Sequence, residues 1–286
     1  IKNDVRIFFL IVWYFVSGAV VHFNLDFSKV YDYREQSSEI ANIGVLAYIN
    51  NWVYSVFTIF LMSWALYKRN FFLFSVLLLV QIFFYGVSNH KSVFFTPIMV
   101  FGVWYYFRRF KSLVILPIGF FIVVGFSLAV YLYIGENLIS SMFIRRVFYV
   151  PVLLTFQYFE FFASNPNVYW SNSIFSSFVS YPYGDSVARE IGLFNETGAS
   201  ANNGFISSGY AHAGVLGVVV YSVILCYLLR LVDSLVVNSD VPVWLAVCMV
   251  LVPLRSTLLS SDLFTTALTH GLLVSVIMLL LFRDSK

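Results

Sequence analysis

Long apolar runs dominate this chain and leave few folds open to it. Segments of about 17 to 25 apolar residues can cross the hydrocarbon core of a bilayer, roughly 30 Å thick, as helices. Hydrophobic residues make up 60% of the chain and charged residues 11%. A soluble domain has a charged fraction of roughly a quarter. We therefore predict an all-α integral membrane protein.

Eight candidate spans predict a polytopic bundle of at least eight transmembrane helices. The third and fourth runs are shorter than the others, so a re-entrant hairpin is an alternative for that pair. Because the chain begins with Ile1 rather than Met, we expect further N-terminal residues, and the count is a minimum. The runs are 5–21, 45–67, 71–85, 93–107, 113–134, 205–229, 243–260 and 263–282.

Basic residues predict the orientation of the spans. If the first residues lie inside and the spans alternate, every basic cluster in a short connecting loop lies inside, so the positive-inside rule places both termini in the cytoplasm. The long polar segment is then outside. The inside residues are Lys2, Arg6, Lys68, Arg69, Arg108, Arg109, Lys111, Arg230, Arg283 and Lys286.

This topology divides the chain into three parts. Residues 1–134 form a first bundle of five spans, residues 135–204 a large outside loop, and residues 205–286 a second bundle of three spans. Within the loop, residues 139–164 predict an aromatic-rich helix at the membrane surface, with Arg146 and Glu160 on one face. The residues that follow are rich in turn formers and predict an irregular segment.

The span that follows the loop carries Gly209, Ala213 and Gly217 at a spacing of four. Small residues in this pattern predict close approach of a neighbouring helix. His212 lies beside them, and two interpretations stay open for it: a packed, hydrogen-bonded histidine, or a catalytic or ligand-binding one.

Metal and cofactor chemistry are not indicated. Cys226 and Cys248 fall inside spans and predict buried small side chains rather than a disulfide or a metal pair. The acidic first outside loop, residues 23–44, lacks an Asp-x-Asp pattern, which favours a solvated loop over a metal site. Zinc spacings and nucleotide-binding fingerprints are absent. A net charge of +3, divided between two membrane faces, gives no support to nucleic-acid binding.

Several short motifs follow one another between Gly86 and Leu229. In this order and topology they resemble the large outside loop of the O-antigen polymerase family, the Wzy-type oligosaccharide repeat-unit polymerases. The motifs are Arg145-Arg146-Val147-Phe148, Val150-Pro151, Tyr158-Phe159-Glu160-Phe161-Phe162, Asn165-Pro166, Tyr169-Trp170-Ser171-Asn172-Ser173, Ala201-Asn202-Asn203-Gly204-Phe205-Ile206 and Ser208-Gly209-Tyr210-Ala211-His212-Ala213-Gly214, with Gly86 and Lys91-Ser92 upstream.

The resemblance implies a glycosyltransferase of the bacterial inner membrane, with the large loop in the periplasm. Such an enzyme polymerises oligosaccharide repeat units carried on undecaprenyl diphosphate into O-antigen or a related surface polysaccharide. Its expected partners are the lipid-linked oligosaccharide, membrane lipids and a protein that regulates chain length. No cofactor is expected.

That chemistry predicts the site residues. The leaving lipid diphosphate needs fixed cations, and Arg189 is our catalytic candidate, with Lys91, Arg145, Arg146 and Arg255 as substrate-binding ones. Contact with lipid headgroups is the alternative for Arg145 and Arg146, and pairing with Asp262 is the alternative for Arg255. The acceptor hydroxyl needs a general base, and the outside candidates are Glu160, His212, Asp185 and Glu190. Of these we name Glu160 and His212, with an ion-pair network around Arg146 as the alternative for Glu160. Asn202 and Asn203 either bind sugar hydroxyls or cap the next span.

Two other functions fit parts of the pattern. An O-antigen ligase or another lipid-linked-sugar glycosyltransferase would share these features and differ in its acceptor. A polysaccharide flippase or exporter, the non-enzyme alternative, should carry polar side chains through both halves of the membrane. In the predicted topology the polar residues gather in the outer half, which favours an enzyme.

Overall fold

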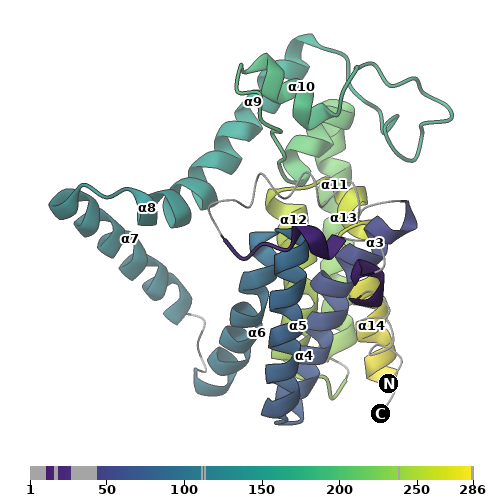
Figure 1. The fold of residues 1–286 in the computed structure, drawn as a ribbon. Coiled ribbons are helices and arrows are strands. Elements are labelled where there is room, and N and C mark those ends of the chain that lie inside the picture. Colours follow the sequence, from purple (N-terminus) through teal and green to yellow (C-terminus); the bar gives the residue numbers. More distant parts are fainter. Residues whose placement is uncertain are drawn as a thin grey trace. The chain divides into compact units, whose positions relative to one another are not determined.

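The computed structural model describes residues 11–15, 19–26, 44–110, 112, 114–237 and 239–284. Within these ranges every regular element is a helix and no strand occurs, which confirms the all-α prediction (Figure 1). The elements are η1 (Ala19–His22), α3 (Val45–Trp52), η2 (Val53–Phe57), α4 (Thr58–Tyr67), α5 (Phe71–Ser88), α6 (Lys91–Arg109), α7 (Ile115–Ile134), α8 (Leu138–Ser140), η3 (Ser141–Tyr149), α9 (Val150–Ser164), α10 (Val187–Phe194), α11 (Phe205–Val237), α12 (Val243–Leu259), α13 (Leu263–Leu268) and α14 (Leu272–Asp284).

Six helical segments in the described part of the chain are long and apolar enough to cross a membrane. Five of them match predicted spans. The sixth, Ile144–Ser164, lies in the segment that we assigned to the outside loop, because its many aromatic and aliphatic residues outweigh its charges. The six are Val45–Tyr67, Phe71–Ser88, Ile115–Ile134, Ile144–Ser164, Phe205–Val237 and Leu263–Arg283.

Three predicted spans are not among the six. Most of the run 5–21 lies outside the described residues, as do Lys2, Arg6, Lys111 and Lys286 and most of the first outside loop. The run 93–107 lies in α6, which begins at Lys91 and ends in Arg108 and Arg109, and these charges lower its mean hydropathy. The run 243–260 forms α12, an apolar helix that is too short to qualify.

The chain packs as two compact units. One comprises Ile1–Arg109, Arg230–Leu254 and Phe264–Lys286, and the other Phe110–Leu229 and Arg255–Leu263. These units divide the chain differently from the predicted ranges 1–134, 135–204 and 205–286.

In the first unit, α3, η2 and α4 form one helical run that packs with α5 and α6 (Figure 1). Its core contains Ile59, Met62 and Phe84, which are fully buried. The Trp52 indole N–H donates to the backbone carbonyl of Leu268 at 2.7 Å.

Cys248 is buried in this unit as predicted. Cys226 of the second unit is exposed, so the prediction of burial was wrong there: its position on α11 faces away from the packed side.

In the second unit, α8, η3 and α9 follow one another without a gap and confirm the predicted helix over residues 139–164. The middle part, η3, is a nine-residue π-helix; such wider turns are rare and often occur at functional sites. Helix α7 packs against this run through Phe120 and Phe148, whose ring centroids lie 5.1 Å apart.

Helix α11 is interrupted in the second unit. Ala213 (φ −151°, ψ 35°) and Gly214 (φ 58°, ψ −143°) leave the helical conformation and divide α11 into two helical parts. Gly214 occupies a backbone region that is essentially restricted to glycine. Because of the interruption, the carbonyls of Tyr210, Ala211 and His212 lose the N–H groups four residues later that would otherwise donate to them. An apolar environment tolerates such carbonyls only where the protein supplies other donors.

The small residues of α11 allow its two helical parts to approach each other closely. A Cβ atom built on Gly217 would lie 2.0 Å from the carbonyl oxygen of Gly209 and 3.3 Å from the Cβ of Ala213. The residues that we expected to admit a neighbouring helix therefore admit the other part of α11 itself. The spacing of four correctly marked a close approach, but the partner was wrong, because an uninterrupted helix would hold residues 209 and 217 roughly 12 Å apart.

We predict that Gly217→Ala lowers the midpoint of thermal unfolding of the purified protein in detergent, because the added methyl group meets backbone atoms that cannot rotate away. Gly125→Ala in α7 is the matched control, since a Cβ there meets nothing within 4 Å. It should leave the midpoint unchanged or raise it, as Ala is favoured over Gly in helices by about 0.5–1 kcal/mol. Equal midpoints for Gly217→Ala and wild type would contradict the close approach.

Candidate functional site

The loop segment 167–170 supplies the donors that the interruption of α11 requires. The Asn167 side-chain amide donates to the carbonyls of Tyr210 and Ala211 at 3.0 and 3.2 Å. The N–H of Val168 donates to Ala211 at 2.9 Å, and the N–H of Tyr169 donates to His212 at 3.0 Å. All three freed carbonyls are thus satisfied by one short stretch of loop.

Four residues form a closed hydrogen-bonded ring at this junction. The Tyr221 hydroxyl donates to Oδ2 of Asp262 at 2.7 Å and accepts from Nε1 of Trp170 at 2.8 Å. His212 contacts the same Asp262 oxygen through Nε2 at 3.3 Å. The ring closes because the backbone N–H of Trp170 donates to Nδ1 of His212 at 3.1 Å. We call Trp170, His212, Tyr221 and Asp262 the ring cluster.

The bonds assign the protons of His212. Because Nδ1 accepts from a backbone N–H, it carries no proton in this arrangement, and the neutral imidazole holds its proton on Nε2, facing the carboxylate. Both ring nitrogens therefore have partners. The Trp170 indole also stacks on the imidazole at 5.0 Å between centroids with a 13° interplanar angle. This environment immobilises the histidine ring.

The loop adopts an unusual backbone to reach this position. Tyr169 and Trp170 both have left-handed conformations, with φ of 49° and 55°. Consecutive aromatic residues seldom adopt this region, which costs of order 1 kcal/mol or more per residue and recurs at functional sites. The hydrogen bonds and the stacking at His212 offset that cost.

A second network ties the segment Ala201-Asn202-Asn203-Gly204 to the helices of the same unit. The amide nitrogen of buried Asn203 lies 2.8 to 3.0 Å from the Pro151 carbonyl, the Thr155 hydroxyl and the Ser207 hydroxyl, which share its two protons. The Tyr158 hydroxyl donates to the Ala201 carbonyl at 3.0 Å. The Asn203 amide nitrogen is thus engaged inside the protein, whereas Asn202 is exposed.

Arg189 and Glu190 of α10 form hydrogen bonds with backbone groups of the neighbouring turns. Arg189 donates to the Gly198 carbonyl, and Glu190 accepts from the Asp185 backbone N–H at 2.9 Å. Partial burial, together with the nearby negative charge of Glu190, raises the pKa of Tyr181 to about 12. The bond to Gly198 gives Arg189 a role in holding the loop.

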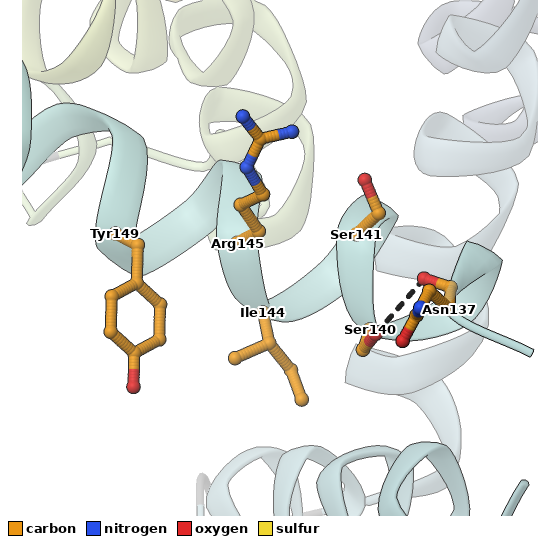
Figure 2. A pocket seen from close by; sticks show the side chains of 6 residues that line it. All are labelled: Asn137, Ser140, Ser141, Ile144, Arg145 and Tyr149. Atoms are coloured by element: carbon orange, nitrogen blue, oxygen red, sulfur yellow. Dashed lines mark hydrogen bonds between the residues drawn. The ribbon is translucent and has the colours of Figure 1, made fainter. Parts of the chain in front are cut away.

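Arg145 borders an open hollow of about 360 Å³ along α8 and η3 (Figure 2). Figure 2 shows Arg145 and Ser141 pointing to one side of the helix, and Ile144 and Tyr149 to the other. Asn137 and Ser140 complete the lining. The guanidinium and the hydroxyls offer hydrogen-bond donors to an anion, and the apolar side chains offer contact to an alkyl chain.

Three of the predicted cations lie at exposed positions. Arg145, Arg146 and Arg255 are exposed, and within the described residues none of them forms an ion pair, so neither predicted alternative, Arg146 with Glu160 or Arg255 with Asp262, is present. Glu160 is exposed on α9. Lys91 begins α6 in the first unit.

The structure thus gathers one predicted site residue, His212, with three residues that the sequence analysis did not select. Asp262 was considered only as a partner for Arg255. A carboxylate between two apolar runs is costly in a membrane and was itself a signal of function. Tyr221 and Trp170 resembled ordinary apolar-run and loop residues, and only the tertiary contacts reveal them.

The ring cluster holds too few ligands for a metal ion. No group of three or more His, Cys, Asp or Glu side chains suited to a metal occurs among the residues that the structure describes.

Comparisons with protein-family models, with curated proteins and with solved structures find no match for this chain.

We predict that Tyr221→Phe destabilises the protein by about 1–3 kcal/mol, because it leaves the Trp170 indole N–H without its acceptor and removes one of the hydrogen bonds to the Asp262 carboxylate. Thermal unfolding in detergent measures the effect. Tyr227→Phe is the matched control, since Tyr227 lies on the same helix and is 68% exposed. If both variants unfold like wild type, the ring cluster contributes nothing to stability and the assignment fails.

Proposed function

We propose that this chain is a membrane glycosyltransferase that polymerises oligosaccharide repeat units linked to undecaprenyl diphosphate. The proposal rests on the sequence resemblance and on one structural observation. The motifs that carry the resemblance are separated in the sequence, yet three of them, at residues 169–173, 201–206 and 208–214, belong to a single packed unit with bonds to one another or to α9. Such convergence is expected of motifs that build one site.

The proposed reaction is a glycosyl transfer. The acceptor hydroxyl oxygen forms a bond to the anomeric carbon of the donor, and the bond between that carbon and the diphosphate oxygen breaks. The diphosphate leaves with the bonding electron pair, and the acceptor loses its proton to a base. The reaction needs a fixed base and fixed cations.

We assign the base to Asp262. The side chain of Asp262 is 22% exposed and that of His212 only 4%, so the carboxylate is the member of the pair that a substrate hydroxyl can reach. Tyr221 and His212 both bond Oδ2 and orient the carboxylate. His212 is then a positioning residue, because both of its ring nitrogens are engaged.

We assign the stabilisation of the leaving diphosphate to exposed arginines. Arg145 and Arg255 belong to the same unit as the ring cluster, and their guanidinium groups are available to phosphate oxygens, which suit bidentate contacts. Arg145 adds a neighbouring hydroxyl at Ser141 and an apolar surface for a lipid chain. Arg189 supports the loop through Gly198 in this proposal.

The proposal includes the finer topology: at least eight spans, a periplasmic loop, an inner-membrane location and both termini in the cytoplasm. An O-antigen ligase uses the same donor chemistry with a different acceptor and is the second candidate. A flippase needs no general base, so the oriented carboxylate favours an enzyme over an exporter.

The test is deletion of the gene in its own host, followed by restoration with wild type, Asp262→Asn or Tyr227→Phe. Wild type and Tyr227→Phe should restore the ladder of surface glycan on a gel. Asp262→Asn should leave a single capped repeat unit, since the amide cannot accept the proton. Immunoblots of membranes and size-exclusion profiles control for the amount and folding of each variant.

Other outcomes of this test are equally informative. If deletion removes even the single unit, the chain is a ligase or a flippase. An unchanged ladder in the deletion strain would overturn the glycan function altogether. A complete ladder with Asp262→Asn would remove Asp262 from the chemistry and leave the polymerase proposal standing.

A further inference from the structure

The loop that leaves the ring cluster exposes an uncharged apolar surface. No Asp, Glu, Lys or Arg occurs in residues 161–184. Every residue of 172–180 is exposed, and the apolar ones are large: Phe178 is 84% exposed, Ile174 53% and Phe175 43%. Figure 1 shows this loop between α9 and α10 as an irregular excursion that stands clear of both helices. A group of large apolar side chains exposed together marks a contact with a protein, a ligand or a membrane.

Several backbone N–H groups of this loop donate to carbonyls of the same loop. The N–H groups of Ser173 and Phe175 donate to the Trp170 carbonyl, and those of Phe178 and Val179 donate to the Phe175 carbonyl, at 2.9 to 3.1 Å. The Ser171 hydroxyl donates to the Val168 carbonyl at 2.6 Å. Irregular backbone that contacts lipid must satisfy its polar groups internally, and this loop satisfies many of its own.

The attachment of the loop fixes its depth. Residues 167–170 are bonded to α11 at its interruption, and the Trp170 indole reaches Tyr221 within the second helical part. Val215 and Leu216, directly after the interruption, are apolar and 71% and 68% exposed. The apolar stretch 215–229, before Arg230, covers only about 22 Å at 1.5 Å per residue. The hydrocarbon core is roughly 30 Å thick. With Arg230 at the opposite membrane surface, as in the proposed topology, the interruption lies at or below the level of the near surface.

We propose that residues 172–180 insert into the bilayer interface and dock the loop on the lipid surface. The occupant is the membrane, because the loop carries no charge, its apolar side chains are exposed, and its anchor lies at membrane level. Phe178 and Ile174 reach the acyl boundary, and the serines between them stay near the headgroups. This docking holds the strained Tyr169–Trp170 backbone at the membrane surface. The docking proposal does not depend on the proposed enzymatic function.

Nitroxide labelling of the full-length protein in phosphatidylethanolamine–phosphatidylglycerol vesicles tests this proposal. Cys226, which is exposed, is replaced by Ser, and Cys248 is buried and stays. A single cysteine is then introduced by Ser177→Cys, which keeps all apolar side chains of the loop, or by Ser200→Cys, an exposed serine beyond α10 that serves as the matched control. Power-saturation spectra measure collisions with oxygen, which partitions into lipid, and with a nickel chelate, which stays in water.

We expect the ratio of oxygen to nickel collisions to be several-fold higher at position 177 than at position 200. Adding Phe178→Asp to the Ser177→Cys protein should lower the ratio to that of position 200, because a buried carboxylate is costly in lipid. Equal ratios at 177 and 200 would overturn the proposal. Low collision rates with both reagents at 177 would overturn it as well, because protein rather than lipid would then cover the loop.

Discussion

The interruption of α11 at Ala213 and Gly214 is the constraint on which the second unit depends. It frees three consecutive carbonyls in an apolar helix, and each of them must find a donor because unsatisfied backbone groups are costly away from water. Residues 167–169 provide those donors. The loop is therefore positioned by the Asn167 side-chain amide and by the backbone N–H groups of Val168 and Tyr169. It also depends on the backbone conformation at Gly214, which is essentially restricted to glycine.

The same constraint builds the ring cluster. Once the loop backbone lies along Tyr210 to His212, Trp170 falls over the imidazole, and its indole reaches Tyr221. Asp262 then receives two hydrogen bonds on a single oxygen. A polar network in such an apolar setting is stable only when the partners of its members are complete. The consequence is an oriented and partly exposed carboxylate, the feature that favours proton transfer as the function of this site.

The helical fold could be predicted from the sequence, whereas most of the tertiary contacts and the residues of the ring cluster could not. Apolar run lengths correctly predicted an all-helical fold, five of the six long apolar helices and the helix over residues 139–164, because these follow from local composition. The helix Ile144–Ser164 also has the length and hydropathy of a membrane span, a property that the sequence analysis did not assign to it because its arginine pair favoured a surface position. The partner of Gly209 and Gly217 was misjudged because a spacing of four looks the same in an intact helix and in an interrupted one. Asp262 and Tyr221 were not selected, since their significance lies in contacts between residues about 40 and 50 positions apart.

Amide hydrogen exchange over residues 167–171 tests the docking of the loop on α11 most directly. The N–H groups of Val168, Tyr169, Trp170 and Ser171 all donate within the protein. The account predicts that a peptide covering them exchanges as slowly as peptides from α9, because slow exchange reports hydrogen bonds that open only with the surrounding structure. Exchange as fast as that of residues 198–200 would contradict the account, and the ring cluster would then lack its support.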